Sequence, residues 1–112
     1  MIDNKIIGSK PKIEYYKTNG VDMVRIPYEI IELRPGKYAW KELIVKFNNF
    51  NYGGIVNALI GMKYSADAMT AIINNYLLDP DDLDAKSEFN TMQEYRKEAK
   101  IIAHSILDNP DK

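Results

Sequence analysis

The sequence predicts a small α+β domain in which an N-terminal antiparallel sheet packs on a C-terminal bundle of two to three helices. Two β-prone runs flank an Asn-Gly pair, apolar residues recur at helical spacing in the second half, and the last helical segment is long and amphipathic. No repeat or linker separates the halves, so residues 1–112 are expected to form a single domain. We expect residues 11–50 to be mostly strands, 53–107 to be helical and 108–112 to be a tail, and we allow 1–10 to be flexible.

The sheet is predicted to begin with a hairpin around Asn19-Gly20. The runs 12–18 and 21–26 are rich in β-branched and aromatic residues, and an Asn-Gly pair tolerates the positive φ angles of a type I′ turn. Pro27 has no amide hydrogen, so it should either end the second strand or place it at an edge. Residues 29–33 can resume extended structure before a turn, which makes the sheet a hairpin or a three-stranded meander.

The segment 38–47 allows two interpretations. Apolar residues recur at helical spacing from Trp40 to Phe47, but Leu43, Val45 and Phe47 also alternate with charged residues, as in a strand. We favour a strand, because β-branched and aromatic residues dominate and a lone hairpin needs further strands to be stable.

Two shorter helices are predicted after the polar and aromatic stretch 48–54. The first covers residues 54–62. Ser65 is a good N-cap for the second, which covers residues 66–78. Proline is tolerated only in the first turn of a helix, so Asp79-Pro80 should end this second helix.

The last helix is expected to begin between Asp79 and Ser87 and to run to about Leu107. Its apolar residues recur every three or four positions from Phe89 to Ile106, while its other face is charged. The short connection to residues 66–78 predicts that the last two helices are antiparallel neighbours.

Composition limits the chemistry and the compartment. The chain has no cysteine, which excludes disulfides, thiolate zinc sites and cysteine nucleophiles and favours a reducing compartment. No apolar run is long enough for a signal peptide or a membrane span, so we expect a cytoplasmic protein that does not enter a membrane. Residues 1–50 carry nine basic and six acidic side chains and residues 51–112 carry six and ten, an asymmetry too small to indicate a dedicated nucleic-acid domain.

Catalytic and metal-binding motifs are missing from the sequence. The only histidine, His104, is explained by its position near the end of a helix, where a protonated imidazole is favourable. The acidic cluster at 79–84 lacks the EF-hand spacing, because Leu83 and Asp84 stand where a ligand and a glycine belong. No P-loop, dinucleotide fingerprint or nucleophile elbow is present. We therefore expect no enzyme, no catalytic residue, no cofactor and no metal.

Aromatic residues of the N-terminal half are the remaining candidates for function. We select Trp40, Phe50 and Tyr52 as interaction residues, around the loop from Asn48 to Gly54. Aromatic side chains often carry the binding energy of protein interfaces, and aromatics among basic residues can also stack on single-stranded nucleic acid. Tyrosine and tryptophan are also ordinary strand residues, so their presence in a sheet does not by itself indicate binding. We favour a non-enzymatic protein-binding domain, with a weak nucleic-acid-binding accessory as the alternative.

The helical half carries a family resemblance. The runs Val56–Ser65, Asp67–Asn75 and Phe89–Lys100 resemble small proteins encoded by phages and integrated elements of gut bacteria, which have an apolar helix ending in a basic-Tyr-Ser or basic-Tyr-Thr corner, a second helix, and a final helix with an aromatic start and an Ala-Lys-rich end. The resemblance covers about half of the chain and departs at Gly61, where the relatives are often basic. It implies a bacterial mobile-element origin and no particular activity.

Overall fold

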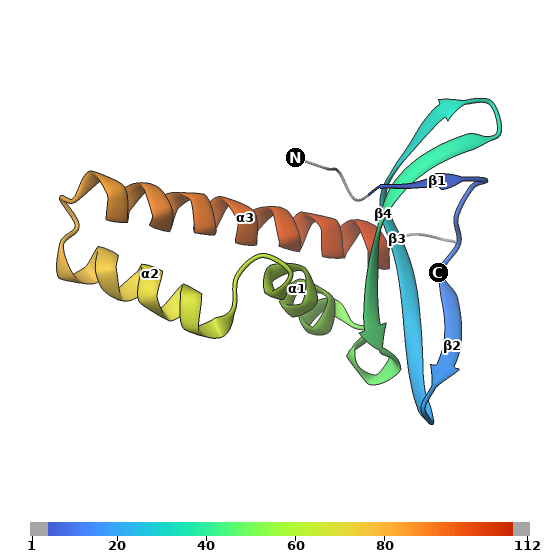
Figure 1. The fold of residues 1–112 in the computed structure, drawn as a ribbon, viewed down its shortest axis with the longest axis horizontal. Helices are drawn as coiled ribbons and strands as arrows, with labels where there is room; N and C mark the ends of the chain where they lie inside the picture. The colour runs from blue at the N-terminus through green and yellow to red at the C-terminus, as the bar shows by residue number, and fades with distance from the viewer. Residues whose placement is uncertain (1–4, 109–112) are drawn as a thin grey trace.

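A computed structural model describes residues 5–108, and all three helices lie on one side of a four-stranded antiparallel sheet (Figure 1). The elements in chain order are β1 (Ile6–Gly8), β2 (Glu14–Thr18), β3 (Val21–Arg34), β4 (Lys37–Lys46), the 3-10 turn η1 (Phe47–Asn49), α1 (Tyr52–Gly61), α2 (Ala66–Leu78) and α3 (Leu83–Leu107). The strand order is β1-β4-β3-β2. The predicted α+β class is confirmed, with one strand more than a three-stranded meander.

The β2–β3 hairpin follows from its turn residues. Asn19 and Gly20 both have positive φ angles, 50° and 78°, as a two-residue turn of this kind requires. The turn pairs Thr18 with Val21 and fixes the register back to Glu14, which lies opposite Arg25. The strand interpretation of residues 38–47 is also confirmed, because β4 covers most of that segment.

Pro27 does not end the second strand, so the first of the two expectations for this residue was wrong. Strand β3 continues through Pro27 to Arg34 and pairs there with β4, so that Pro27 lies opposite Glu42. On its other side β3 has no partner at this position, because β2 pairs only as far as Arg25. The missing amide hydrogen is tolerated there because β3 is locally an edge, which was the other expectation.

Strand β1 was not predicted, since residues 1–10 were allowed to be flexible. Its three residues pair with β4, with Ile7 opposite Ala39 and Gly8 opposite Tyr38. The expectation for residues 1–4 and for most of the tail at 108–112 lies outside the described part of the chain.

A β-bulge separates the core part of the β3–β4 hairpin from a projecting arm. The register shifts between Tyr28 and Ile31, and Glu29 has a positive φ of 50° at the shift. The Glu29 carboxylate forms an ion pair with Lys41 of β4, in which Nζ lies 2.8 Å from Oε2. Beyond the bulge the hairpin extends past the helices (Figure 1), and Ile31 and Leu33 are exposed there.

The core lies between one face of β3 and β4 and the helices α1 and α3. Alternate strand residues point into it because successive side chains of a strand alternate between the faces. The buried residues of this core are Val24, Ile26, Tyr28, Leu43, Val45, Ile55, Val56, Leu59, Ile60, Ala99, Ala103 and Ile106. Among residues 5–108, no helix covers the opposite face of the sheet (Figure 1).

Capping residues set the helix starts. Asn51 accepts a hydrogen bond from the Gly54 amide at 2.8 Å, and Ser65 accepts one from Ala68 at 3.0 Å, as its N-cap assignment predicted. Asp82 accepts from the amides of Asp84 and Ala85, so this acidic residue begins α3. Helices α2 and α3 run antiparallel and project together away from the sheet (Figure 1).

The Tyr95 side chain links α3 to α1 through a hydrogen bond, and removing its hydroxyl group is a first test of the fold. Its hydroxyl donates to the Leu59 carbonyl at 2.8 Å. Tyr95→Phe should lower the free energy of unfolding by about 1 kcal/mol, because a partly buried carbonyl loses its donor. Urea denaturation of the two proteins measures the difference, and an unchanged midpoint would show that this bond does not hold the helices together.

The stability difference between the wild type and Tyr95→Phe should depend on pH. Burial, aided by Tyr64 and Glu29 and opposed by Lys41, raises the pKa of Tyr95 above its ordinary value. The unfolded chain therefore loses this proton first, so the contribution to stability is complete below pH 10 and is lost as the pH rises through the folded-state pKa. We expect Tyr95→Phe to lose less stability than the wild type as the pH rises from below 10 through the folded-state pKa of Tyr95, which urea denaturation at a series of pH values measures.

Candidate functional site

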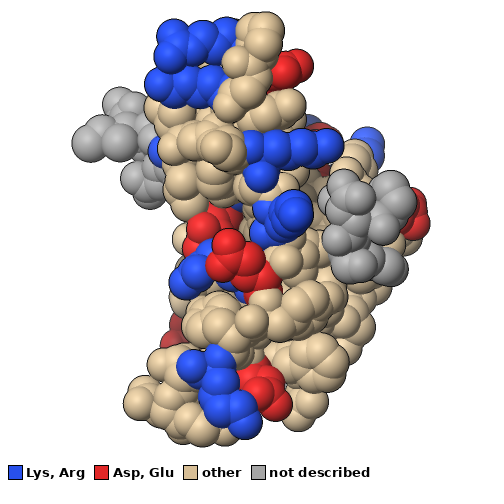
Figure 2. Space-filling model, turned by 90° about the vertical axis from the view of Figure 1, so that its right-hand side faces the viewer, with Lys and Arg blue, Asp and Glu red and all other residues tan. Residues whose placement is uncertain are grey.

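The helix-free face of the sheet carries a mixture of charged and apolar side chains. Figure 2 views this side of the molecule, where basic and acidic residues are interspersed with uncharged surface. Arg25 and Pro27 of β3 and Trp40 and Glu42 of β4 belong to this face, since they alternate with core residues along their strands. Charged groups of both signs therefore surround the one tryptophan of the chain.

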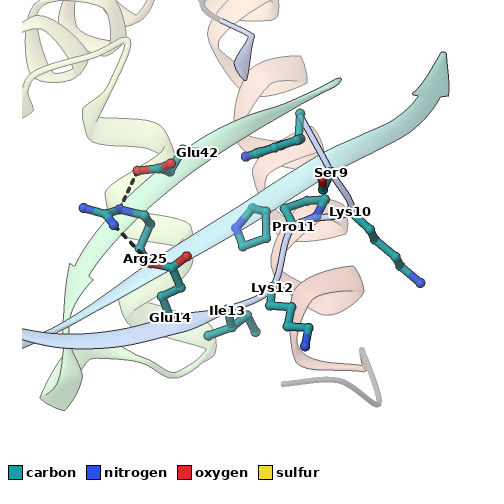
Figure 3. Close-up of a pocket in the computed structure, with 10 residues that line it drawn as sticks. Ser9, Lys10, Pro11, Lys12, Ile13, Glu14, Arg25 and Glu42 are labelled. Atoms are coloured by element: carbon teal, nitrogen blue, oxygen red, sulfur yellow. Dashed lines mark hydrogen bonds and ion pairs between the residues drawn. The ribbon is translucent and has the colours of Figure 1, made fainter. Parts of the chain in front are cut away.

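A groove of about 410 Å³ opens on this face beneath the connection between β1 and β2 (Figure 3). We call it the Trp40 groove; its lining residues are Ser9, Lys10, Pro11, Lys12, Ile13, Glu14, Arg25, Pro27, Trp40 and Glu42. Pro27 is buried, and Pro11, Ile13 and Trp40 are partly buried, as are Arg25 and Glu42, so apolar and charged side chains share the inner lining. The indole packs against Gly8, where an added Cβ would lie 3.4 Å from Cη2 of Trp40.

Arg25 is the electrostatic centre of the Trp40 groove. Its Nε lies 2.9 Å from Glu42 Oε1 and its Nη1 lies 3.2 Å from Glu14 Oε2 (Figure 3), and the guanidinium stands 4.7 Å from the centre of the Tyr16 ring. Partial desolvation lowers the pKa of Arg25, but Glu42, Tyr16 and Glu14 together raise it above its ordinary value. The three contacts fix the arginine across β2, β3 and β4.

Two lysines supply the remaining positive charge of the groove. Lys10 and Lys12 are both exposed, and both extend away from the Arg25 contacts in Figure 3. Since Arg25 lies between two carboxylates, these lysines determine the charge that an approaching molecule meets at the rim.

The structure does not bring the three predicted interaction residues together. Trp40 lines the groove. Phe50 packs against the core and makes an edge contact with Tyr15, with ring centres 6.2 Å apart. Tyr52 begins α1 and lies against His104 of α3, with ring centres 4.6 Å apart. The contact with Tyr52 gives His104 a packing role in addition to its helix-end position.

Arg25 was missed as a site residue although a signal for it existed. A two-residue turn at Asn19-Gly20 places Glu14 opposite Arg25 by counting outward from the turn. The second carboxylate, Glu42, depends on the register between β3 and β4, and no local motif gives that register.

The geometry offers recognition by apolar contact and charge. Within residues 5–108, no three histidine or acidic side chains are grouped so that they could hold a metal ion. In the same part of the chain, every helix is too short or too polar to cross a membrane. Comparisons of the chain with protein-family models, with curated proteins and with solved structures found no match.

Proposed function

We propose that the protein is a non-enzymatic domain that binds a segment of another protein in the Trp40 groove. The observation that carries the proposal is a groove in which Pro11, Ile13, Pro27 and Trp40 line a sheet face that no helix of residues 5–108 covers. Interface centres are typically apolar and aromatic, with charged groups at the rim, and tryptophan and arginine are enriched among the residues that matter most for affinity.

The charges favour a segment with an acidic flank. Arg25 is already held by Glu14 and Glu42, so it adds little net charge. The exposed ammonium groups of Lys10 and Lys12 would meet the partner first and would attract carboxylates.

Nucleic acid is the less favoured ligand. A phosphate in the Trp40 groove would meet the carboxylates of Glu14 and Glu42 as well as the lysines. Single-stranded oligonucleotide binding that weakens steeply as salt rises would support this alternative instead.

The biological setting is part of the proposal. The resemblance of the helical half to proteins of bacterial mobile elements supports a role in a phage or prophage assembly. The absence of cysteine supports a cytoplasmic location. The segment bound by the groove would then belong to another protein of that assembly.

Comparative capture tests this function. Wild-type protein, Trp40→Ala and Tyr52→Ala are immobilised and exposed to nuclease-treated extract of the native host, and bound proteins are quantified by mass spectrometry. We expect a partner that the wild type and Tyr52→Ala retain equally and that Trp40→Ala retains at least about 10-fold less, because losing an interface tryptophan commonly costs about 2 kcal/mol.

A second variant separates binding from stability. Lys10→Glu combined with Lys12→Glu changes only exposed side chains, and it should reduce capture of the same partner while thermal melting stays unchanged. Equal capture by the wild type and both groove variants would rule out the Trp40 groove as the binding site.

A further inference from the structure

The turn of the β2–β3 hairpin combines exposure with a sequence context that occurs once in the chain. Asn19 and Gly20 are both exposed, and the turn lies at the end of the sheet opposite the projecting arm (Figure 1). Asn19 is the only asparagine that precedes a glycine. Exposed turns open locally far more often than the core of a fold does. The two residues therefore sample conformations other than the closed turn.

The Asn19 side chain is not held in place by its surroundings. Among residues 5–108, it makes no hydrogen bond, ion pair or ring contact. A Cβ at Gly20 would meet no atom within 4 Å, so the space beside this residue is open. Glycine also has no side chain that could restrict the approach of its own amide nitrogen to a neighbouring group. When the turn opens, the Gly20 amide nitrogen can therefore reach Cγ of Asn19.

We propose that Asn19 is a site of spontaneous deamidation. The Gly20 amide nitrogen loses its proton to hydroxide and attacks Cγ of Asn19. A bond from this nitrogen to Cγ forms, the bond from Cγ to Nδ2 breaks, and Nδ2 takes up a proton from water and leaves as ammonia. The product is a five-membered succinimide, in which the nitrogen is bonded to both Cγ and the main-chain carbonyl carbon.

Water then opens the succinimide in one of two ways. Addition of water at Cγ breaks its bond to nitrogen and gives aspartate with the original main chain. Addition at the main-chain carbonyl carbon gives isoaspartate, whose main chain runs through Cβ and Cγ. In either case one water molecule is consumed and one ammonia molecule is released.

Other asparagines of the described chain are held more firmly. Four lie within α1, α2 and α3, where the amide of the following residue is engaged in the hydrogen-bond ladder of the helix: Asn57, Asn74, Asn75 and Asn90. The Asn51 side chain accepts a hydrogen bond from the Gly54 amide and donates one to the Asn48 carbonyl. The reaction should therefore be concentrated at Asn19.

The isoaspartate product changes the geometry of the hairpin. It adds one carbon atom to the main chain of a two-residue turn, and this turn sets the register that places Glu14 opposite Arg25. We expect the lengthened turn to uncouple β2 from β3 and to break the 3.2 Å contact between Glu14 and Arg25. The aspartate product leaves the main chain unchanged, and aspartate tolerates a positive φ as asparagine does.

Peptide mapping of aged protein tests the reaction. Full-length protein is incubated in neutral and in mildly alkaline buffer and is then digested with trypsin. Cleavage after Lys17 and Arg25 releases residues 18–25, in which Asn19 is the only asparagine. This peptide should gain more isoaspartate than Asn57, Asn74, Asn75 and Asn90 together, and should gain it faster in alkaline buffer, because the attacking nitrogen is deprotonated. An unmodified peptide, or equal modification of the helical asparagines, would overturn the proposal.

Thermal melting with two variants tests the structural consequence. The deamidated fraction is separated by its additional negative charge, and it should melt at least about 4 °C below fresh protein. Asn19→Asp reproduces the aspartate product alone and should melt like the wild type. Asn19→Gly keeps a residue pair suited to positive φ angles and cannot react, so it should yield no such fraction. Equal melting of the deamidated fraction and Asn19→Asp would rule out that isoaspartate uncouples the strands.

Discussion

Replacing Gly54 by alanine should lower the free energy of unfolding by about 3 kcal/mol, since overpacking against a rigid neighbour costs about that much. A Cβ at Gly54 would collide with the carbonyl oxygen of Asn49 and would lie 2.7 Å and 2.9 Å from its carbonyl carbon and Cα. All three atoms belong to the backbone, so no side chain can turn aside. The turn η1 and the start of α1 would have to separate.

Gly61→Ala is the matched control for this prediction. Gly61 is the last residue of the same helix, and an added Cβ there meets no atom within 4 Å. Alanine should therefore raise the free energy of unfolding by about 0.5 kcal/mol, through the lower entropy of the unfolded chain. Urea denaturation of the three proteins measures both effects. Equal effects of the two substitutions would mean that η1 does not lie against α1 as closely as the structure has it.

Ile26→Ala should destabilise the protein by about 4 kcal/mol, the second large effect. Ile26 is fully buried in β3, within the core formed with α1 and α3. Truncation removes the transfer free energy of three carbons and leaves a cavity that the sheet and helices close only in part. Thermal or urea unfolding gives the difference.

Ile44→Ala provides the comparison for the sheet's other face. Ile44 lies on the adjacent strand β4 and is 46 % exposed. We expect this substitution to cost less than about 1 kcal/mol. If Ile44→Ala cost as much as Ile26→Ala, the helix-free face would be covered rather than open.

Local signals explain how much of the fold the sequence predicts. The Asn19-Gly20 turn, the Ser65 cap and the break at Asp79-Pro80 each act within a few residues, and the observed hairpin, α2 and α3 begin or end where these signals lie. The choice of strand for residues 38–47 was correct because the hairpin needed a further partner.

Long-range pairing explains what the sequence does not predict. Strand β1 has three residues and pairs with β4 some thirty positions away, so no local pattern marks it. The bulge at Glu29 depends on how β3 and β4 align. The Trp40 groove also depends on long-range pairing, because the β1–β2 connection passes over β3 and β4. Trp40 could be selected from residue type and Arg25 by counting outward from the Asn19-Gly20 turn, but Glu42 required the register between β3 and β4.

The separation of Trp40, Phe50 and Tyr52 has the same cause. The three lie within 13 positions in the sequence, but β4, η1 and α1 change direction between them. Trp40 is on the helix-free face, while Phe50 packs on the core and Tyr52 lies against α3. Closeness in sequence therefore does not predict a shared site here.

The single tryptophan makes the central claim directly measurable. Protein labelled with fluorotryptophan gives one fluorine NMR resonance, which arises from Trp40. Our account predicts that the partner captured in a Trp40-dependent manner shifts or broadens this resonance, and that the Lys10→Glu and Lys12→Glu double variant reduces the change at equal partner concentration. A resonance that is unchanged at saturating partner would contradict binding in the Trp40 groove.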